Sequence, residues 1–219
     1  MSRADDVAAA VAAVRGRIAA AAARAGRDAA SVTLVAVGKT KPLEDLLAAH
    51  AAGVTHFGEN RVQEAETKFP LLPAGVTRHL IGPIQSNKAG RAAKIAEVVQ
   101  TVDSAELARR LSRAAETAGR RLRVLIEVRL GGEVTKAGVE PDDVAALSHA
   151  IRALPALDLS GLMTIPPLGN TQPHFATLRS LAEKLGLREL SMGMSDDFEV
   201  AIEEGATLVR VGTAIFGSR

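Results

Sequence analysis

The chain has 219 residues, a length that one α/β barrel commonly fills, and its 47% hydrophobic and 24% charged residues are an ordinary globular balance. Its 27 basic and 25 acidic residues are interspersed, for a formal net charge of +2, and no basic run or aromatic stripe favours nucleic-acid binding. The lack of cysteine excludes disulfides, thiolate nucleophiles and cysteine metal sites, and because it fits a reducing compartment we expect a cytoplasmic protein.

The N-terminal segment 1–26 is rich in alanine and predicts an amphipathic helix rather than a signal peptide. Four apolar residues recur at helical spacing, namely Val7, Val11, Val14 and Ile18. Charged residues interrupt the segment, and these are Asp5, Asp6, Arg15 and Arg17. We expect the helix to end near Gly26 and to pack on the outside of the fold, with a partner-binding helix as the alternative. No segment reaches transmembrane length, so we expect no membrane partner.

Short runs of β-branched residues alternate with longer helical stretches through the rest of the chain. The predicted strands are Thr33–Val37, Thr55–Gly58, His79–Gly82, Val98–Val102, Arg123–Val128, Leu159–Met163, Glu189–Ser191 and Leu208–Val211. Helix start signals between them are Ser86, Ser104 with Glu106, Pro141, and Ser195 with Asp196 and Asp197. Strands separated by helices imply parallel pairing with right-handed crossovers.

Eight such strands are most simply accommodated by a single closed (β/α)8 TIM-type barrel. We expect one domain over 1–219, because no linker-like stretch divides the chain, and the N-terminal helix then fills the position of the helix that usually follows strand eight. An open doubly wound sheet is the alternative. Such a sheet usually has a glycine-rich turn after its first strand, whereas residues 37–42 match neither G-x-G-x-x-G nor the phosphate-loop pattern.

Lys39 directly follows the first predicted strand, at the end of a barrel where active sites lie. It shares its parity with Val35 and Val37, so Lys39 points into the mouth of the barrel if those valines point inward. Apolar surroundings would disfavour its ammonium form and provide a free amine for a Schiff base. A solvated loop lysine, equivalent to Lys41, is the alternative.

The loops after strands seven and eight have the composition of a phosphate site. They contain Ser191, Gly193, Gly212 and Thr213. Small residues with free backbone N–H groups are what barrels commonly use there to bind phosphate. Closure of the barrel places strand eight beside strand one, and therefore this cradle beside Lys39. An amine next to a phosphate cradle is typical of a site for pyridoxal 5′-phosphate (PLP).

Arg210, within strand eight, has two interpretations. If its guanidinium faces the pyridine nitrogen of PLP, it opposes protonation of the ring and weakens the ring as an electron sink, which disfavours transaminase chemistry. The alternative is an ordinary ion pair with Glu203 or Glu204.

Other polar residues at strand ends carry weaker signals. Glu59 and Asn60 follow strand two and either orient a ligand or cap the next helix. A lone histidine such as His79 is more often a hydrogen-bonded structural residue than a catalyst. The five histidines show no metal-ligand spacing and no G-x-S-x-G elbow is present, so we predict neither a metal site nor a hydrolase triad.

Five segments of the chain match the motifs of a known family. They are 35–42 (VAVGKTKP), 57–64 (FGENRVQE), 79–88 (HLIGPIQSNK), 190–198 (LSMGMSDDF) and 209–217 (VRVGTAIFG). These segments resemble the PLP homeostasis (YggS/PROSC-like) proteins, and the last two are highly specific. The resemblance runs from about residue 30 to the end. It implies a fold-type III PLP barrel related to the N-terminal domain of alanine racemase, without the β-rich second domain of that enzyme.

The resemblance assigns roles to residues of this chain. Lys39 aligns with the Schiff-base lysine, and Arg210 aligns with the arginine that faces the pyridine nitrogen. Ser191, Gly212 and Thr213 match phosphate-contacting positions. The full predicted PLP-binding set is Lys39, Asn60, His79, Ser191, Met192, Gly193, Arg210, Gly212 and Thr213. Lys136 falls where the family has another lysine-bearing motif, which predicts a secondary PLP site.

The chain departs from the family pattern at four places. Gly38 stands where serine is usual, Arg78 where tryptophan is common and Arg129 where asparagine is typical, and the loop 166–171 is short. We expect these departures to affect the rim and the surroundings of the ring more than the phosphate cradle. They therefore bear on substrate-side and partner contacts rather than on PLP binding.

Three functions remain open from the sequence. The first is a PLP carrier in vitamin B6 homeostasis, with little or no turnover, whose partners are PLP and apo forms of PLP-dependent enzymes. The second is an amino-acid racemase-like PLP enzyme, and the third is a barrel enzyme for another phosphorylated metabolite, in which Lys39 forms a transient imine as in aldolases.

The lack of a second base favours the carrier. A two-base racemase needs an acid/base on the opposite face of the cofactor, and alanine racemase uses a tyrosine from its partner's second domain. This chain has no tyrosine and no cysteine, and His79 is the only nearby candidate. We therefore expect a PLP-binding protein that is not an enzyme. We also expect a monomer, because the site is complete within one chain.

Overall fold

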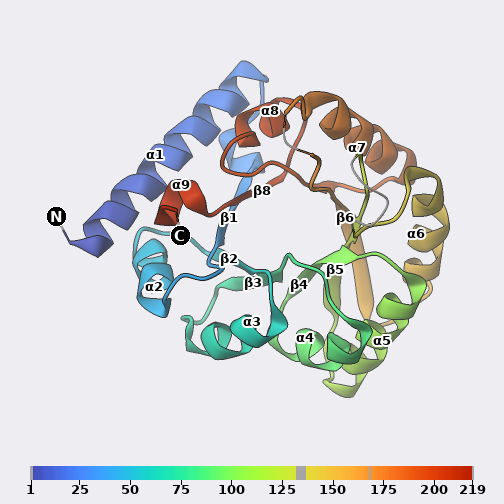
Figure 1. Cartoon of the computed structure of the whole chain (residues 1–219). Helices are drawn as coiled ribbons and strands as arrows, with labels where there is room; N and C mark the ends of the chain where they lie inside the picture. The colour runs from blue at the N-terminus through green and yellow to red at the C-terminus, as the bar shows by residue number, and fades with distance from the viewer. Residues whose placement is uncertain (1, 132–136, 168, 219) are drawn as a thin grey trace.

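Eight parallel strands form a closed barrel in the computed structural model, which describes residues 2–131, 137–167 and 169–218. The strands are β1 (Thr33–Val37), β2 (His56–Glu59), β3 (Thr77–Leu80), β4 (Val98–Val102), β5 (Leu122–Glu127), β6 (Leu157–Met163), β7 (Glu189–Ser191) and β8 (Leu208–Val211). Each strand pairs with the next one along the chain, and β8 returns to β1, where Val35 is opposite Arg210. Figure 1 shows this ring of strands inside a ring of helices. The predicted (β/α)8 barrel is confirmed, and an open sheet is excluded.

The third strand is displaced from its predicted position by two residues at both ends, a larger shift than in any other strand. The sequence predicts His79–Gly82, whereas β3 is Thr77–Leu80. Gly82 belongs to the loop that follows, where a Cβ atom on it would lie 2.3 Å from the main-chain oxygen of Asn60. The glycine allows the loops after β2 and β3 to approach each other closely, and this approach ends the regular strand.

Helices follow the strands around the outside of the barrel. They are α1 (Arg3–Arg24), α2 (Leu43–Ala51), α3 (Val62–Lys68), α4 (Ala89–Ile95), α5 (Ala105–Thr117), α6 (Val144–Arg152), α7 (Gln172–Leu185), α8 (Phe198–Glu203) and α9 (Thr213–Phe216), with short 3₁₀ turns η1 (Ala29–Ser31), η2 (Phe69–Leu71), η3 (Ser86–Lys88) and η4 (Pro141–Asp143). The predicted cap at Ser104 is present, since its hydroxyl accepts from the N–H of Leu107 at 3.2 Å. Ser86 and Pro141 start 3₁₀ turns that lead into α4 and α6.

Helix α1 lies along the outside of the barrel between α2 and α8, close to α9 (Figure 1). Its four apolar residues at helical spacing are all buried, and these are Val7, Val11, Val14 and Ile18. Ser2 and Asp5 form a capping box at its start. Arg3 ties this end of the helix down by donating to Asp45 on α2 and to the main-chain oxygen of Phe216.

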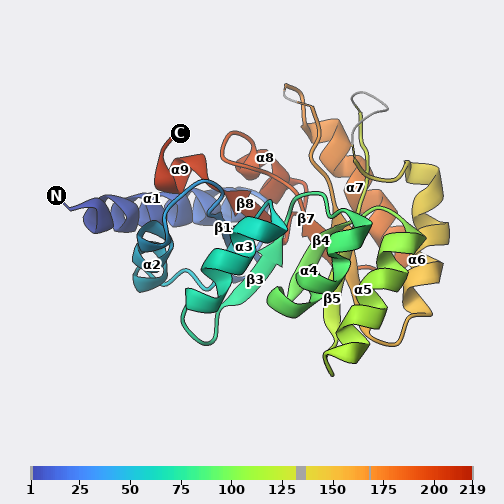
Figure 2. The ribbon, with the colours of Figure 1, turned by 60° about the horizontal axis from the view of Figure 1, so that its bottom comes forward.

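The hydrophobic core has two parts. The larger part is the shell between strands and helices, where Phe57, Phe69 and Phe198 are fully buried. The smaller part, inside the barrel, contains Val98, Leu125 and Met163. Part of the remaining interior is polar, which is unusual for a space that barrels normally fill with branched apolar side chains. This polar interior leads upward to the mouth of the barrel, and Figure 2 shows α9 and the C-terminus at the upper edge of the molecule.

Candidate functional site

A pocket of about 170 Å³ lies at the mouth of the barrel, where the strands end. We call it the mouth pocket, and it is lined by Val37, Lys39, Asn60, Ile81, Ile165, Met194, Ser195, Asp196, Arg210, Gly212 and Thr213. Five of the predicted site residues meet here: Lys39, Asn60, Arg210, Gly212 and Thr213. The other four, which do not line the pocket, are His79, Ser191, Met192 and Gly193.

Lys39 reaches the mouth pocket with its amine uncommitted. Its Nζ makes no hydrogen bond or ion pair with another described residue, whereas Lys41 Nζ donates to the main-chain oxygen of Ser218 at 2.8 Å. The two lysines of this turn are therefore not equivalent. The expected desolvation of Lys39 by apolar neighbours is wrong, because the side chain lies on the rim and is exposed.

The loops after β7 and β8 form a cradle of hydrogen-bond donors beside Lys39. Among the described residues, the N–H groups of Ser195, Gly212 and Thr213 donate to no other group. Thr213 is the first residue of α9, so its N–H has no acceptor within the helix. Ala214 N–H donates to Ser195 Oγ at 3.3 Å and links the two loops. Free N–H groups and hydroxyls in this arrangement bind an anion such as phosphate.

Arg210 forms the buried wall of the pocket. Its NH1 donates to Ser191 Oγ at 2.7 Å and its NH2 donates to the main-chain oxygen of Thr164 at 2.9 Å. Burial lowers the pKa of Arg210 to about 10, which still leaves it cationic at neutral pH. The alternative ion pairs are wrong, since Glu203 pairs with Arg24 and Glu204 with Arg179.

A chain of hydrogen bonds crosses the barrel interior below Arg210, and we call it the interior relay. Ser191 donates to Gln100 Oε1 at 2.6 Å, Gln100 Nε2 lies 2.9 Å from His79 Nδ1, and His79 Nε2 lies 3.0 Å from His56 Nδ1. A guanidinium can only donate hydrogen bonds, so Ser191 Oγ accepts one from Arg210. The Ser191 hydroxyl then donates its own hydrogen bond to Gln100. The Gln100 amide then donates to His79, so neutral His79 carries its hydrogen on Nε2 and donates to His56. Every bond of the relay therefore points away from Arg210.

The interior relay explains the placement of two predicted site residues. His79 is 1% exposed, and desolvation, with smaller contributions from His56 and Arg123, lowers its pKa to about 3. It is therefore a neutral structural residue. Ser191 is fully buried between Gln100 and Arg210, so the serine of this loop that lines the pocket is Ser195, four residues later.

The remaining members of the LSMGMS segment shape the backbone. Met192 is buried in the outer shell of the core. Gly193 has φ of +90°, and a Cβ on it would lie 2.6 Å from Ala201 Cβ. Its main-chain oxygen accepts from the N–H of Arg210 at 3.0 Å. Glycine is thus required here to bring the loop after β7 against β8.

Glu127, at the end of β5, is a buried acid that the sequence reasoning missed. Its Oε2 has no hydrogen-bond partner among the described residues. Desolvation and the charge of Asp103 raise its pKa to about 7, while Arg210 opposes the rise. Glu127 is two residues after the inward-facing Leu125, so strand alternation could have placed its side chain in the barrel interior. Glu127 does not line the mouth pocket.

The departures from the family pattern lie at different depths. Gly38 packs so closely that a Cβ on it would lie 2.8 Å from Glu59 Oε1. Arg78 lies within β3, where its N–H donates to Glu97, so it is away from the rim. Arg129 donates to Glu140 above β5. Lys136, the predicted secondary site, lies outside the described residues.

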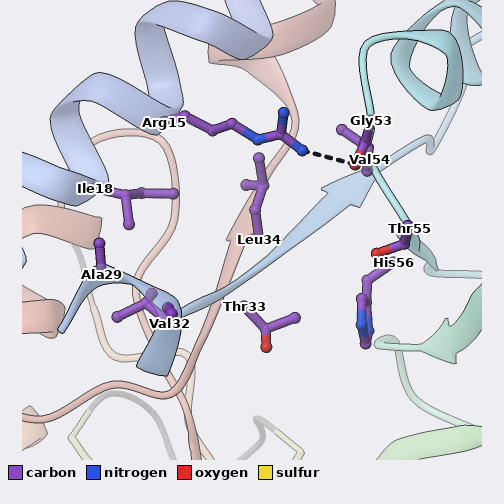
Figure 3. Close-up of a pocket in the computed structure, with 11 residues that line it drawn as sticks. Arg15, Ile18, Ala29, Val32, Thr33, Leu34, Gly53, Val54, Thr55 and His56 are labelled. Atoms are coloured by element: carbon purple, nitrogen blue, oxygen red, sulfur yellow. Dashed lines mark hydrogen bonds between the residues drawn. The ribbon is translucent and has the colours of Figure 1, made fainter.

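A larger pocket, of about 420 Å³, lies at the opposite end of the barrel between α1 and the starts of β1 and β2 (Figure 3). Figure 3 shows Arg15 extending from α1 towards Gly53, with Thr33 and His56 on the other side. Arg15 donates to the main-chain oxygens of Ala52 and Gly53, so its charge is already engaged. No lysine is among the residues that line this pocket, so its chemistry does not match that of the mouth.

No helix in the described part of the chain is long and apolar enough to cross a membrane. No group of three or more His, Asp or Glu side chains there could hold a metal ion.

Residues 10–219 match the family model described as alanine racemase, N-terminal domain. A protein of Pseudomonas aeruginosa named pyridoxal phosphate homeostasis protein is 47% identical over 95% of this chain and 94% of its own length. The structure of PipY from Synechococcus elongatus with PLP bound superposes with a TM-score of 0.84, at 40% identity, over 96% of this chain and 100% of that one.

A more distant structure shows the same fold alone. Alanine racemase from Corynebacterium glutamicum superposes with a TM-score of 0.71 at 20% identity. The match covers 99% of this chain but 61% of the racemase. The barrel is therefore the part that the two proteins have in common.

Proposed function

Because this chain belongs to the pyridoxal phosphate homeostasis protein family, we propose that it binds PLP in the mouth pocket and acts in vitamin B6 homeostasis. The observation that carries the proposal is that one pocket presents the uncommitted amine of Lys39 and the free N–H donors of Ser195, Gly212 and Thr213. These residues fit the two ends of PLP, an aldehyde and a phosphate. The structure of PipY with PLP bound supports the same cofactor.

Each residue of the pocket then has a defined task. When bound, PLP supplies an aldehyde that condenses with an amine and a ring that withdraws electrons. Lys39 provides the amine, and the loops that carry Ser195 and Thr213 hold the phosphate. Arg210, the cation that lines the pocket, would keep the ring nitrogen unprotonated if it faced that atom, because two cations would repel each other there. Asn60 orients the ring from the loop after β2.

Attachment at Lys39 is tested by reduction and peptide mapping. Protein incubated with PLP and reduced with borohydride should carry the label on the peptide that contains Lys39, and Lys39→Ala should abolish the label. Lys41→Ala is the matched control, because Lys41 Nζ is engaged by Ser218, and it should keep the label. A label confined to Lys41 or Lys136 would contradict the assignment.

The family name supports a role in homeostasis, and we extend the proposal to a protein with little or no catalytic turnover. The chain has no tyrosine, and His79 is buried, with its Nδ1 bonded to Gln100 and outside the lining of the mouth pocket, so neither supplies a second base. The Arg210 cation beside the ring nitrogen also weakens the ring as an electron sink. A racemase-like activity is the alternative, and it would need Asp196, the carboxylate that lines the pocket, as its second base.

Turnover is tested by incubating the PLP-loaded protein with L- and D-alanine in deuterated water. We expect exchange of the Cα hydrogen far below the ordinary enzyme range of roughly 1–10³ per second. Exchange within that range, abolished by Asp196→Asn, would establish the racemase-like alternative instead.

The proposal extends to partners and location. We propose a cytoplasmic monomer that passes PLP to apo forms of PLP-dependent enzymes and binds neither nucleic acid nor membranes. Interspersed charges and the lack of a membrane-spanning helix in the described residues support this view. Transfer is tested by mixing labelled holo-protein with an apo-transaminase and a trap for free PLP. Activation that the trap abolishes would contradict direct transfer.

A further inference from the structure

Two side chains of α3 hold the peptide groups on both sides of Lys39. Lys68 Nζ donates to the main-chain oxygen of Gly38 at 2.8 Å, and this oxygen belongs to the peptide that precedes Lys39. Glu64 Oε1 accepts from the N–H of Thr40 at 2.6 Å, and this N–H belongs to the peptide that follows Lys39. Both backbone planes next to the Lys39 Cα are therefore fixed from one helix.

The two side chains belong to a buried ionic cluster with Glu59, which we call the lysine clamp (Glu59, Glu64 and Lys68). Lys68 Nζ lies 3.0 Å from Glu59 Oε1 and 2.5 Å from Glu64 Oε1. Glu59 is fully buried and Lys68 is 9% exposed. With the Gly38 oxygen, three acceptors saturate the three hydrogens of the ammonium. Because unpaired buried charges are very unfavourable, this cluster tolerates little movement.

The backbone of the loop is strained where the lysine clamp holds it. Thr40 has φ of +64° and is the only non-glycine residue with positive φ among those described. A β-branched residue rarely adopts this conformation, and such strain persists only where surrounding contacts enforce it. The bond from Thr40 N–H to Glu64 is such a contact. Gly38 adds to the effect, because its missing Cβ leaves space for Glu59 Oε1 and for Leu46.

We propose that Lys68 and Glu64 are positioning residues that set the direction in which the Lys39 side chain projects from its loop. This direction in turn determines how well the Lys39 amine attaches PLP. The proposal rests on the proposed function, in which Lys39 is the point of attachment. Lys68 does not line the mouth pocket and has no free hydrogen, so it acts through the backbone.

Lys68→Met tests the proposal, because it keeps the apolar stem and removes the ammonium. Two ligands separate positioning from general damage: PLP, and pyridoxine 5′-phosphate, which has the same ring and phosphate but an alcohol in place of the aldehyde. We expect PLP retention to fall about tenfold or more, as for the loss of a charged hydrogen bond. Affinity for pyridoxine 5′-phosphate should not change, because the phosphate cradle is intact.

Control variants sharpen this result. Lys94→Met, at an exposed position of α4, should change neither affinity. Lys68→Arg, which keeps a cation able to bond Gly38 and the two carboxylates, should restore most of the PLP retention. If Lys68→Met fails to fold, Glu64→Ala carries the same test, because Glu64 is partly exposed and its loss still frees the Thr40 N–H.

A measurement without PLP tests the positioning role of the lysine clamp independently of the proposed PLP-binding function. In cofactor-free protein, Glu64→Ala should accelerate hydrogen exchange at the Thr40 amide about tenfold, because its acceptor is lost. Unchanged exchange and unchanged PLP retention in a folded variant would overturn the positioning role, and so would an equal loss of both ligands. Failure of borohydride to label Lys39 in the unmodified protein would instead overturn the proposed function, while the amide exchange would still report on the lysine clamp.

Discussion

The interior relay and the lysine clamp are two polar clusters that each hold a cationic residue of the mouth pocket in place, and they do so with different kinds of interaction. The interior relay uses one cation and a series of neutral groups, and each group both accepts and donates where it can. The lysine clamp uses one cation between two carboxylates, and Glu59 Oε2 is left without a partner. The relay supports Arg210 and the clamp supports Lys39. Directional neutral bonds fix a group deep inside, whereas an ion cluster fixes a strained loop at the surface.

Gln100→Leu breaks the relay at its centre and is expected to have the largest effect on folding. It leaves the hydrogen of the Ser191 hydroxyl without an acceptor and His79 Nδ1 without a donor inside the barrel, which should destabilise the protein by about 2–5 kcal/mol. Urea unfolding measures this loss. Gln63→Leu, at an exposed position of α3, is the control and should stay within about 0.5 kcal/mol. An equally small effect at Gln100 would mean that the relay contributes no stability.

The relay also predicts a loss of stability in acid. The pKa of His79 is lowered from 6.5 to about 3. Below pH 6.5, therefore, this histidine binds a proton in the unfolded chain but not in the folded protein. The contribution is therefore complete above pH 6.5 and should fall by about 2–4 kcal/mol as the pH approaches 3. Unfolding of the wild type and of His79→Gln across this range gives the difference. Parallel pH curves for the two would contradict a neutral, buried His79.

Glu127 predicts the opposite slope at higher pH. Its pKa is raised from 4.5 to about 7, so between these values the folded protein keeps a proton that the unfolded chain has released. Its contribution is complete below pH 4.5 and should fall by about 2–3 kcal/mol as the pH rises through 7. Glu127→Gln should flatten this part of the stability curve. Glu44→Gln, at an exposed position of α2, is the matched control.

Two serines four residues apart distinguish the relay from the phosphate cradle, with the smallest expected effect. Ser195→Ala should weaken PLP binding by about 1–2 kcal/mol, at the low end for bonds to charged groups because Ser195 is half-buried. Ser191→Ala should instead lower stability and leave the preference for PLP over pyridoxal unchanged. The affinities of each variant for PLP and for pyridoxal distinguish the two roles. If Ser191→Ala, and not Ser195→Ala, lost the preference for PLP, Ser191 would be the serine that contacts the phosphate.

Strand parity allowed much of the fold and part of the site to be predicted from the sequence. The alternation of β-branched runs with helical stretches predicted the eight strands, parity predicted the inward direction of Val35, and barrel closure placed Lys39 beside Gly212 and Thr213. Local pattern could not reveal contacts between residues far apart, such as Ser191 with Gln100. Nothing in the sequence around Lys68 indicates that its amine reaches the main-chain oxygen of Gly38.

The seam between β1 and β8 sets the order in which this protein becomes functional during synthesis. Lys39 leaves the ribosome early, but Thr213 lies near the far end of the sequence, and Arg3 of α1 bonds the main-chain oxygen of Phe216. The nascent chain therefore cannot close its barrel or assemble its anion cradle until β8 and the loop that follows it have emerged. Until then β1 has one unpaired edge, which favours aggregation. A ligand of the mouth pocket can therefore bind only after β8 has paired with β1.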